Sequence, residues 1–340
     1  MIRAILNKNQ PSTALVLILI ALFASINPSK ASSGEEEEPL GEVIMHHITD
    51  AHSWHFFDGH YGTLHLPVIL YSSDKGIEIF SSSNLYDEHH NHVTYEGRYA
   101  LDEGGHLEAK AGQTFTDFSI TKNVAMLFIN AIIMVLIFTA VAKGYKRNQG
   151  KAPKGIQSFF EPIIVFVRDE VVKPNIGPRY EKYLPYMLHL FFFIWFGNLL
   201  GLLPGAANLT GNIAVTMVLA VLTFLITNFS GNKSYWGHIF NTPGVPLLLK
   251  PIIIPVEIIG VFTKPISLMV RLFVAISAGH IVLLSLMGLT FIFHSWAVGV
   301  GSSFVVIFIN LIELLVATIQ AYVFTMFSSL YIGAAIEEHH

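Results

Sequence analysis

Four polar residues in the C-terminal third of the chain have side chains that could hold or transfer a proton. Arg271, His280, Glu313 and Gln320 all lie in stretches that are otherwise apolar. A charged side chain at the centre of a bilayer costs about 2.5–3.5 kcal/mol or more, so such a residue needs a partner, a water-filled cavity or a function. Histidine and glutamate can bind and release protons, whereas arginine keeps its charge. The set is therefore typical of an ion path through a membrane.

The composition indicates a polytopic membrane protein. Hydrophobic residues make up 52% of the chain and charged residues only 13%, whereas about 25% are charged in an average soluble domain. Apolar stretches of about 20 residues, the length that spans a bilayer, recur from about residue 120 to the end. The chain has no cysteine, which excludes structural disulfides and thiolate metal sites.

The first third of the chain is predicted to be exported. Residues 1–31 have the pattern of a signal peptide, with basic Arg3 and Lys8, an apolar stretch and a small-residue cleavage site. The alternative is an uncleaved first membrane helix. Residues 32–118 are predicted to form a small polar exterior domain with a few strands, since apolar and polar residues alternate along segments 63–71 and 77–80. The domain is rich in histidine, but HExxH spacing is absent, so a hydrated domain with buffering or loosely metal-binding histidines is favoured over a zinc site.

Residues 119–340 are predicted to form the membrane domain. The first span covers about residues 120–141, and the lysine- and arginine-rich stretch after it, residues 143–154, is placed in the cytoplasm by the positive-inside rule. Residues 155–173 suit an amphipathic helix at the cytoplasmic surface, ended by Pro174 and Pro178. Further apolar segments cover residues 183–203, 212–229 and, interrupted by prolines, 247–261. We therefore expect five to six membrane helices.

The last part of the membrane domain is predicted to be a helical hairpin at about residues 262–336. No Asp, Glu, Lys or Arg occurs from Leu272 to Ile312. One helix of that length would measure about 60 Å, roughly twice the hydrocarbon thickness, so the chain must turn back, at about residues 294–303. Both arms are long enough to require a strong tilt. The fold class is therefore an all-α polytopic membrane protein with a tilted hairpin and a small exterior N-terminal domain.

Arg271 is predicted to lie on a face of small residues, which allows another helix to dock or slide closely. His280 lies nine residues further on, half a turn away on the helical wheel, and does not share that face. The residues that share the face are Ser267, Arg271, Ala275, Ala278 and Gly279.

The turn of the hairpin can bring His280 opposite Glu313 at a similar depth. Asn310, Glu313, Ala317 and Gln320 form one stripe on the second arm. A lone buried histidine or glutamine often only joins two helices, at about 0.6 kcal/mol, but the whole set on one hairpin favours a function. Lys264 and Glu257 lie near an expected interface, where charged side chains commonly extend into water.

Several motifs resemble subunit a of the F-type ATP synthases, the stator of the membrane-embedded rotary motor. The resemblance covers about residues 115–340 and implies a subunit that is not catalytic on its own and has no cofactor. It implies as partners the c-ring, b-type peripheral stalk subunits, the F1 sector indirectly and the lipid bilayer, with no nucleic acid. The motifs are Lys264-Pro-Ile-Ser-Leu-Met-Val-Arg-Leu-Phe273, Ala278-Gly-His280, Glu313, Gln320-Ala-Tyr-Val-Phe324, Tyr331, the Glu337-Glu-His339 tail, Asn198-Leu-Leu-Gly-Leu-Leu-Pro204 and Asn212.

The resemblance also implies roles for individual residues. Arg271 would face the proton-carrying carboxylate of the c-ring, His280 and Glu313 would line the half-channel from the exterior, and Gln320 would position Arg271. Other residues would line the channel or the ring interface: Ser267, Asn212, Lys264, Glu257, Asn310 and Tyr331.

Two departures from the family pattern stand out. Many bacterial members have Glu at the position of His280 and His at the position of Glu313, and an exchanged pair indicates contact. Many also have Asn at the position of Ala275.

The expected function is that of a proton-channel stator with two offset half-channels that load and unload the ring carboxylates. The expected location is the bacterial inner membrane, with the N-terminal domain periplasmic and the C-terminus cytoplasmic. One alternative is a secondary ion-coupled transporter that uses Arg271 and Glu313, but such a transporter predicts inverted repeats, and none is seen in the sequence. Another is a histidine-rich membrane protein that handles metal.

Overall fold

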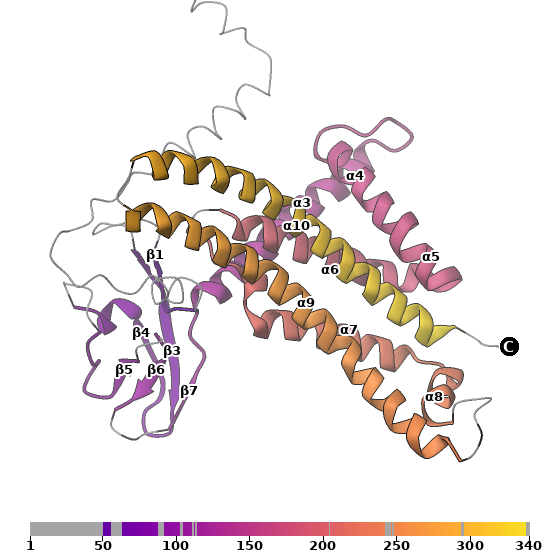
Figure 1. The fold of residues 1–340 in the computed structure, drawn as a ribbon, viewed down its shortest axis with the longest axis horizontal. Coiled ribbons are helices and arrows are strands. Elements are labelled where there is room, and N and C mark those ends of the chain that lie inside the picture. Colours follow the sequence, from indigo (N-terminus) through magenta and orange to yellow (C-terminus); the bar gives the residue numbers. More distant parts are fainter. Residues whose placement is uncertain are drawn as a thin grey trace, which may run out of the picture. The chain divides into compact units, whose positions relative to one another are not determined.

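A computed structural model describes residues 50–55, 63–87, 92–102, 105–110, 112, 114–203, 205–241, 246, 248–293 and 296–337. The predicted signal peptide, residues 1–31, lies outside them. The described residues between 50 and 120, which we call the β region, contain short strands, and helices follow from residue 122 onward (Figure 1).

The strands of the β region all pair in the antiparallel direction. β3 (Pro67–Ser72) is the middle strand of a three-stranded sheet, between β4 (Gly76–Ser81) and β7 (Phe115–Asp117). β1 (Ser53–His55) pairs with β2 (Thr63–His65), and β5 (Tyr99–Leu101) pairs with β6 (Leu107–Ala109). Strands therefore occur in both segments where the sequence alternates. An apolar core beside β3, β4 and β5 consists of Val68, Leu70, Phe80, Leu85, Tyr99 and Leu101.

The remainder of the described chain is helical, and the predicted fold class is confirmed. Five helical segments of the described residues are long and apolar enough to cross a membrane: Lys122–Arg147, Ile156–Gly201, Ile213–Ser230, Lys250–Leu286 and Gly299–Ile336. The individual elements are α3 (Lys122–Arg147), α4 (Ile156–Phe166), a π-helical stretch (Val167–Val172), α5 (Lys173–Ile176), α6 (Tyr180–Gly201), α7 (Ile213–Ser230), α8 (Lys233–Phe240), α9 (Lys250–Phe293) and α10 (Trp296–Ile336).

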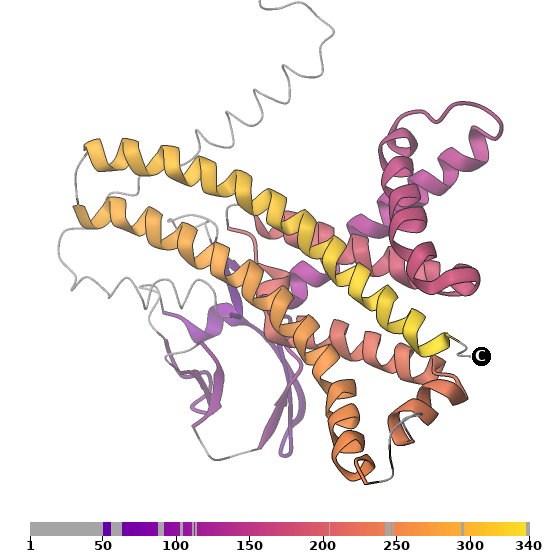
Figure 2. The ribbon, with the colours of Figure 1, turned by 45° about the vertical axis from the view of Figure 1, so that its right-hand side comes forward.

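The helical hairpin consists of α9 and α10, which lie side by side (Figure 2). With 44 and 41 residues, the arms measure roughly 66 and 62 Å. The first arm begins earlier than predicted: it starts at Lys250 and runs through Pro255 and Pro265, so the apolar segment 247–261 is not a separate element. Prolines of this kind are tolerated in membrane helices because neighbouring groups satisfy the freed backbone atoms.

The segment predicted as an amphipathic surface helix packs one side against the helical bundle. Val167, Val172 and Ile176 are buried in the same apolar core as residues of α6 and α10. The prediction that Pro174 ends the helix is wrong. Pro174 lies in the first turn of α5, where its missing N–H is not needed. The chain turns at Gly177, whose φ of 74° is strained for any other residue.

Candidate functional site

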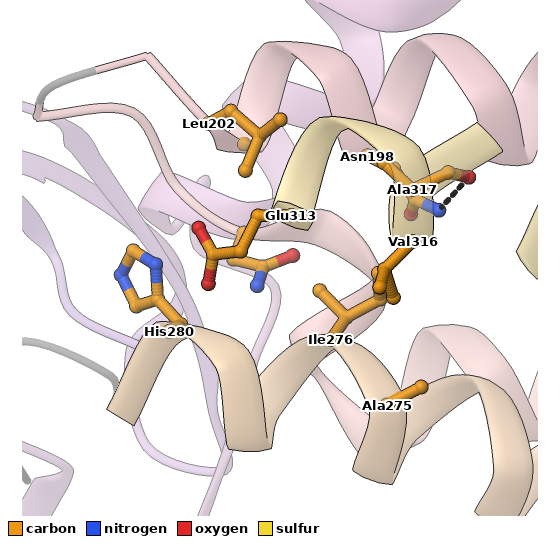
Figure 3. A pocket seen from close by; sticks show the side chains of 10 residues that line it. Asn198, Leu202, Ala275, Ile276, His280, Glu313, Val316 and Ala317 are labelled. Atoms are coloured by element: carbon orange, nitrogen blue, oxygen red, sulfur yellow. Dashed lines mark hydrogen bonds between the residues drawn. The ribbon is translucent and has the colours of Figure 1, made fainter. Parts of the chain in front are cut away.

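His280 on α9 and Glu313 on α10 line one small cavity, which we call the hairpin cavity. Figure 3 shows the two side chains facing each other from the two arms. The predicted approach of these residues across the hairpin is therefore found in the structure. The other residues that line the hairpin cavity are Asn198, Gly201, Leu202, Asn208, Ala275, Ile276, Val316 and Ala317.

The Glu313 side chain is only 8% exposed. Its Oε2 atom is buried and has no hydrogen-bond partner among the residues that the structure describes. A buried, unpaired carboxylate oxygen is rare and costly in folded proteins; a bound proton would remove its charge, and a water molecule would give it a hydrogen-bond partner. Glu313 therefore has the surroundings expected of a group that takes up and releases a proton.

A second cavity, which we call the loop cavity, adjoins the first. It is lined by Ser277 and His280 of α9, by the start of α3 and by the loop between α6 and α7. His280 and Asn208 line both cavities. The half-buried His280 therefore lies between the loop cavity and Glu313. The remaining residues of the loop cavity are Lys122, Asn123, Ala206, Ala207 and Gly211.

Arg271 lies on α9 away from both cavities and is exposed on the surface of this chain. Its guanidinium carbon is 4.4 Å from the centre of the Phe327 ring on α10, which is close enough for a cation–π interaction. It precedes His280 by nine residues, or about 13 Å along the helix. Because the Arg271 side chain is exposed, a residue of another chain can reach its charge.

The structure only partly groups the other residues that the sequence singles out. Gln320 is half-buried on α10, seven residues after Glu313, and is not among the residues that line either cavity. Asn310 is half-buried one turn before Glu313, and Ser267 is exposed one turn before Arg271. Ser267 and Arg271 thus share an exposed surface. Gln320 and Asn310 lie on α10, the helix that carries Glu313, but line neither cavity.

Asn212 has a structural position. It caps the N-terminus of α7, and its Oδ1 accepts a hydrogen bond of 2.8 Å from the Ala214 N–H. It does not line either cavity. A cap satisfies backbone donors that the first turn of a helix leaves free. The polar character of Asn212 is thereby accounted for without a channel.

Two further candidates form local pairs at a distance from the cavities. Lys264 Nζ lies 5.6 Å from the centre of the Tyr331 ring, which joins α9 to the end of α10. Glu257 Oε1 lies 4.0 Å from Nδ1 of His238. Both Glu257 and His238 are more than one third exposed, so this pair contributes little to stability.

Another helix approaches part of the small face around Arg271, and this helix belongs to the same chain. Ala275 lines the hairpin cavity, and a Cβ atom at Gly279 would lie 2.6 Å from Glu313 Oε1. This part of the small face therefore packs against α10 of the same chain. Only Ser267, Arg271 and Ala278 remain exposed.

Asn208 and the start of α3 were missed by sequence reasoning. Asn208 lies in a loop, and Lys122 and Asn123 begin the first span. None of the three shares a helix face with His280. Asn198, by contrast, stands out as a polar residue in an apolar span. Its Nδ2 donates to the Ala317 backbone oxygen at 3.1 Å, which joins α6 to α10 beside the hairpin cavity.

In the β region, His52 Nε2 lies 3.2 Å from Asp117 Oδ2. Among the residues that the structure describes, no group of three or more His, Asp and Glu side chains could hold a metal ion. The histidines there thus give no support to a metal-handling function within the described part of the chain.

Comparison with known proteins agrees with this architecture. The family described as ATP synthase A chain matches residues 124–333, and a domain of unknown function matches residues 43–127. ATP synthase subunit a 2 of Chlorobaculum tepidum is 42% identical over 332 residues, 96% of this chain and 80% of that protein. ATP synthase subunit a of Chlorobium phaeobacteroides is 40% identical over 321 residues, 92% of this chain and 80% of that protein. ATP synthase subunit a of an Anaeromyxobacter species is 37% identical over 319 residues, 91% of this chain and 73% of that protein. The chain therefore belongs to the ATP synthase A chain family.

Proposed function

We propose that Arg271, His280, Glu313 and Gln320 form the proton-translocation site in the function of this family, the proton-channel stator of the F0 sector of ATP synthase. The observation that supports the proposal best is the hairpin cavity, which His280 and Glu313 line together from α9 and α10. Two side chains that can each bind a proton and share a buried cavity form a short relay. The chain itself catalyses no covalent step, since it moves an ion.

The relay begins in the loop cavity. Protons from the exterior reach His280 there, pass to Glu313 in the hairpin cavity and leave from Glu313 to a carboxylate of the c-ring. The unpaired Oε2 of Glu313 supports this order, because a proton taken up there would remove the cost of a buried, unpaired charge.

Arg271 separates the two half-channels. A carboxylate of the ring can enter the hydrocarbon only in its neutral form, because a bare charge there is too costly. Beside Arg271 it can be ionised, since the guanidinium group stabilises the negative charge. Arginine does not give up its own proton, so it blocks a direct leak. Protons must board the ring and travel round it, and at 100 mV each crossing charge carries about 2.3 kcal/mol.

Gln320 and the exposed Ser267 act beside Arg271 in this proposal. Gln320 lies two turns beyond Glu313 on α10, on the side of the hairpin toward Phe327, and helps to position the guanidinium group. Ser267 lies one turn before Arg271 and belongs to the surface that meets the ring.

The proposed setting is a bacterial inner membrane. The β region faces the periplasm, and the basic stretch at residues 143–154 and the C-terminus face the cytoplasm, in agreement with the positive-inside rule. The proposed partners within the ATP synthase are the c-ring and the b-type stalk subunits, with F1 reached through them. A secondary transporter is not favoured, because the relatives are subunits of ATP synthase.

Replacement of Arg271 by alanine tests the proposal. In vesicles that contain the assembled complex, we expect Arg271→Ala to abolish ATP-driven proton pumping and to leave or raise passive proton leak. Val274→Ala removes another exposed side chain of α9 and should keep pumping close to wild type. Retained coupled ATP synthesis in Arg271→Ala would contradict the proposed role.

A further inference from the structure

The loop between α6 and α7, residues 202–212, forms a wall of both cavities. Ala206, Ala207 and Gly211 line the loop cavity, and Asn208 lines the loop cavity and the hairpin cavity. Asn208 therefore lies with His280 at the junction where the two cavities meet.

The backbone around Asn208 holds it in one place. Its Oδ1 accepts a hydrogen bond of 3.2 Å from the Gly211 N–H. A Cβ atom at Gly201 would lie 3.2 Å from Asn208 Cα, and one at Gly211 would lie 3.0 Å from Asn208 Cγ. The side chain is thus enclosed between two glycines. A shift of the loop would move Asn208 with it.

The β region holds this loop through Trp54. The indole Nε1–H donates a hydrogen bond of 2.6 Å to the backbone oxygen of Gly205. The ring is only 7% exposed and packs in a small apolar core with Leu66, Met126 and Ala207. Gly205 has a φ of 76°, a conformation that other residues rarely adopt. The loop therefore turns so that its backbone oxygen meets a tryptophan of the β region.

The β region also contacts the opposite wall of the loop cavity. Asp50 Oδ1 accepts a hydrogen bond of 3.2 Å from the Asn123 N–H, and the Ala51 backbone oxygen accepts one of 2.9 Å from the Lys122 N–H. Lys122 and Asn123 both line the loop cavity. Two walls of the same cavity are therefore attached to one small sheet-containing region.

We propose that the β region is a positioning element of the exterior half-channel, with Trp54 as its main positioning residue. By fixing the loop at Gly205, Trp54 keeps Asn208 at the junction and keeps the loop cavity open to His280. The inference rests on the proposed function. It assigns a task to a part of the chain that lies outside the match to the ATP synthase A chain family and inside the match to a domain of unknown function.

The test compares two tryptophan substitutions in the complete complex. Trp54→Phe keeps an aromatic ring but removes the N–H donor, and Trp54→Ala removes the ring as well. Trp236→Phe is the matched control, since Trp236 lies on α8 and stacks on Phe240, away from both cavities. Passive proton conduction is measured in vesicles stripped of F1, and assembly is measured by co-purification of the c-ring.

A second measurement reports on the cavity itself. The chain has no cysteine. Ser277→Cys therefore gives the chain a single thiol, which lines the loop cavity. The rate at which a small membrane-impermeant thiosulfonate added from the exterior labels this position is followed by mass spectrometry, with and without each tryptophan substitution. This rate depends on access to the thiol and on the fraction of it that is ionised, and it does not require proton transfer between His280 and Glu313.

We expect Trp54→Phe to lower passive conduction about five-fold, the effect of losing one hydrogen bond, to change the labelling rate by a similar factor and to leave c-ring co-purification intact. Trp54→Ala should have a larger effect on conduction and labelling, and Trp236→Phe none. Wild-type conduction and labelling in Trp54→Phe would overturn the inference, and so would lower conduction with unchanged labelling. If Trp54→Ala fails to assemble, Trp54→Phe decides.

His280→Ala in the same vesicles separates this inference from the function on which it rests. If His280→Ala blocks conduction and Trp54→Phe has no effect, only the positioning role is wrong. If His280→Ala conducts like the wild type, the proposed half-channel is wrong, whatever Trp54→Phe does.

Discussion

Gly279 on α9 and Glu313 on α10 touch across the hairpin, so closely that a Cβ atom at position 279 would lie 2.6 Å from Glu313 Oε1. Any side chain at position 279 would collide with the carboxylate. The missing side chain of Gly279 therefore allows Glu313 to occupy the hairpin cavity beside His280. In the Ala-Gly-His sequence at 278–280, His280 thus lines the cavity and Gly279 leaves room for Glu313.

Gly279→Ala should impair proton transfer without preventing assembly. The added methyl group forces the Glu313 carboxylate to move, which it can do because it is the end of a flexible side chain. We expect passive proton conduction in F1-stripped vesicles to fall about ten-fold, since a displacement of about 1 Å can cost more than that in a proton transfer.

Gly260→Ala provides the control for this change. Gly260 lies on the same helix, and a Cβ atom there would have no heavy atom within 4 Å. Passive proton conduction by the Gly260→Ala variant should equal that of the wild type. Equal conduction in the two glycine variants would show that the contact between positions 279 and 313 does not matter for transfer.

Exchange of His280 and Glu313 should be milder than removal of either one. Both side chains line the hairpin cavity, so His280→Glu combined with Glu313→His keeps one histidine and one carboxylate in it. We expect the double variant to retain ATP-driven acidification of vesicles at a level at least about ten-fold above His280→Ala or Glu313→Ala, in line with the usual contribution of general acid–base groups. Complete loss in the double variant, equal to that in the alanine variants, would count against a direct pair.

Phe327 should affect how tightly Arg271 couples proton flow to ATP hydrolysis. The Arg271 guanidinium carbon lies 4.4 Å from the centre of the Phe327 ring, a contact worth about 0.5–2 kcal/mol. Phe327→Leu removes the ring face, and we expect the ratio of protons pumped to ATP hydrolysed to fall by a factor of about two to ten. Phe327→Tyr keeps the ring and should preserve the ratio.

The control for Phe327→Leu is the same substitution at Phe304, which is 73% exposed on α10. Indistinguishable pumping ratios in Phe327→Leu and Phe327→Tyr would show that the ring face does not hold the guanidinium group.

The hairpin and its central pair could be predicted because they depend on local patterns. A stretch without charged residues from 272 to 312 is too long for one crossing, and the helical period separates the faces of Arg271 and His280. The start of α9 at Lys250 could not be predicted in this way. Pro255 is read as a helix breaker in a single sequence, and only neighbouring helices remove that penalty.

The walls of the cavities depend on tertiary packing, so the sequence pattern missed them. Asn208 lies in a loop, and Lys122 begins a helix far from the hairpin in sequence. Nothing in their spacing relates them to His280. The helix that packs on the small face could not be identified from the sequence either, because the helical wheel finds small residues at Ala275 and Gly279 but does not say which helix approaches them.

The β region should lose stability in acid, because two of its carboxylates are stabilised in their ionised form. Burial raises the pKa of Glu78, but hydrogen bonds from Tyr99 and Ser72 and the charge of Arg98 outweigh it and hold the pKa below its usual range. Burial likewise raises the pKa of Asp117, and hydrogen bonds from His52 and Ser119 lower it further than burial raises it. A carboxyl group with a lowered pKa in the folded state stabilises the fold above its unfolded pKa, about 4, and this stabilisation is lost as the pH falls through the folded value.

Hydrogen exchange of the complete subunit in detergent measures this loss. We expect protection factors in β3 and β4, corrected for intrinsic exchange, to be constant from pH 7 to pH 5 and to fall below about pH 4. Glu78→Gln should reduce protection already at pH 7, by about ten-fold, because Arg98 Nη1, 2.8 Å from Glu78 Oε1, loses a charged partner in a site where both side chains are at most 15% exposed. Glu108→Gln is the control, since Glu108 is 52% exposed and its ion pair with Lys110 contributes little. Protection that stays constant down to pH 3, or an equal effect of the two glutamine variants, would show that the contacts of Glu78 do not stabilise the sheet.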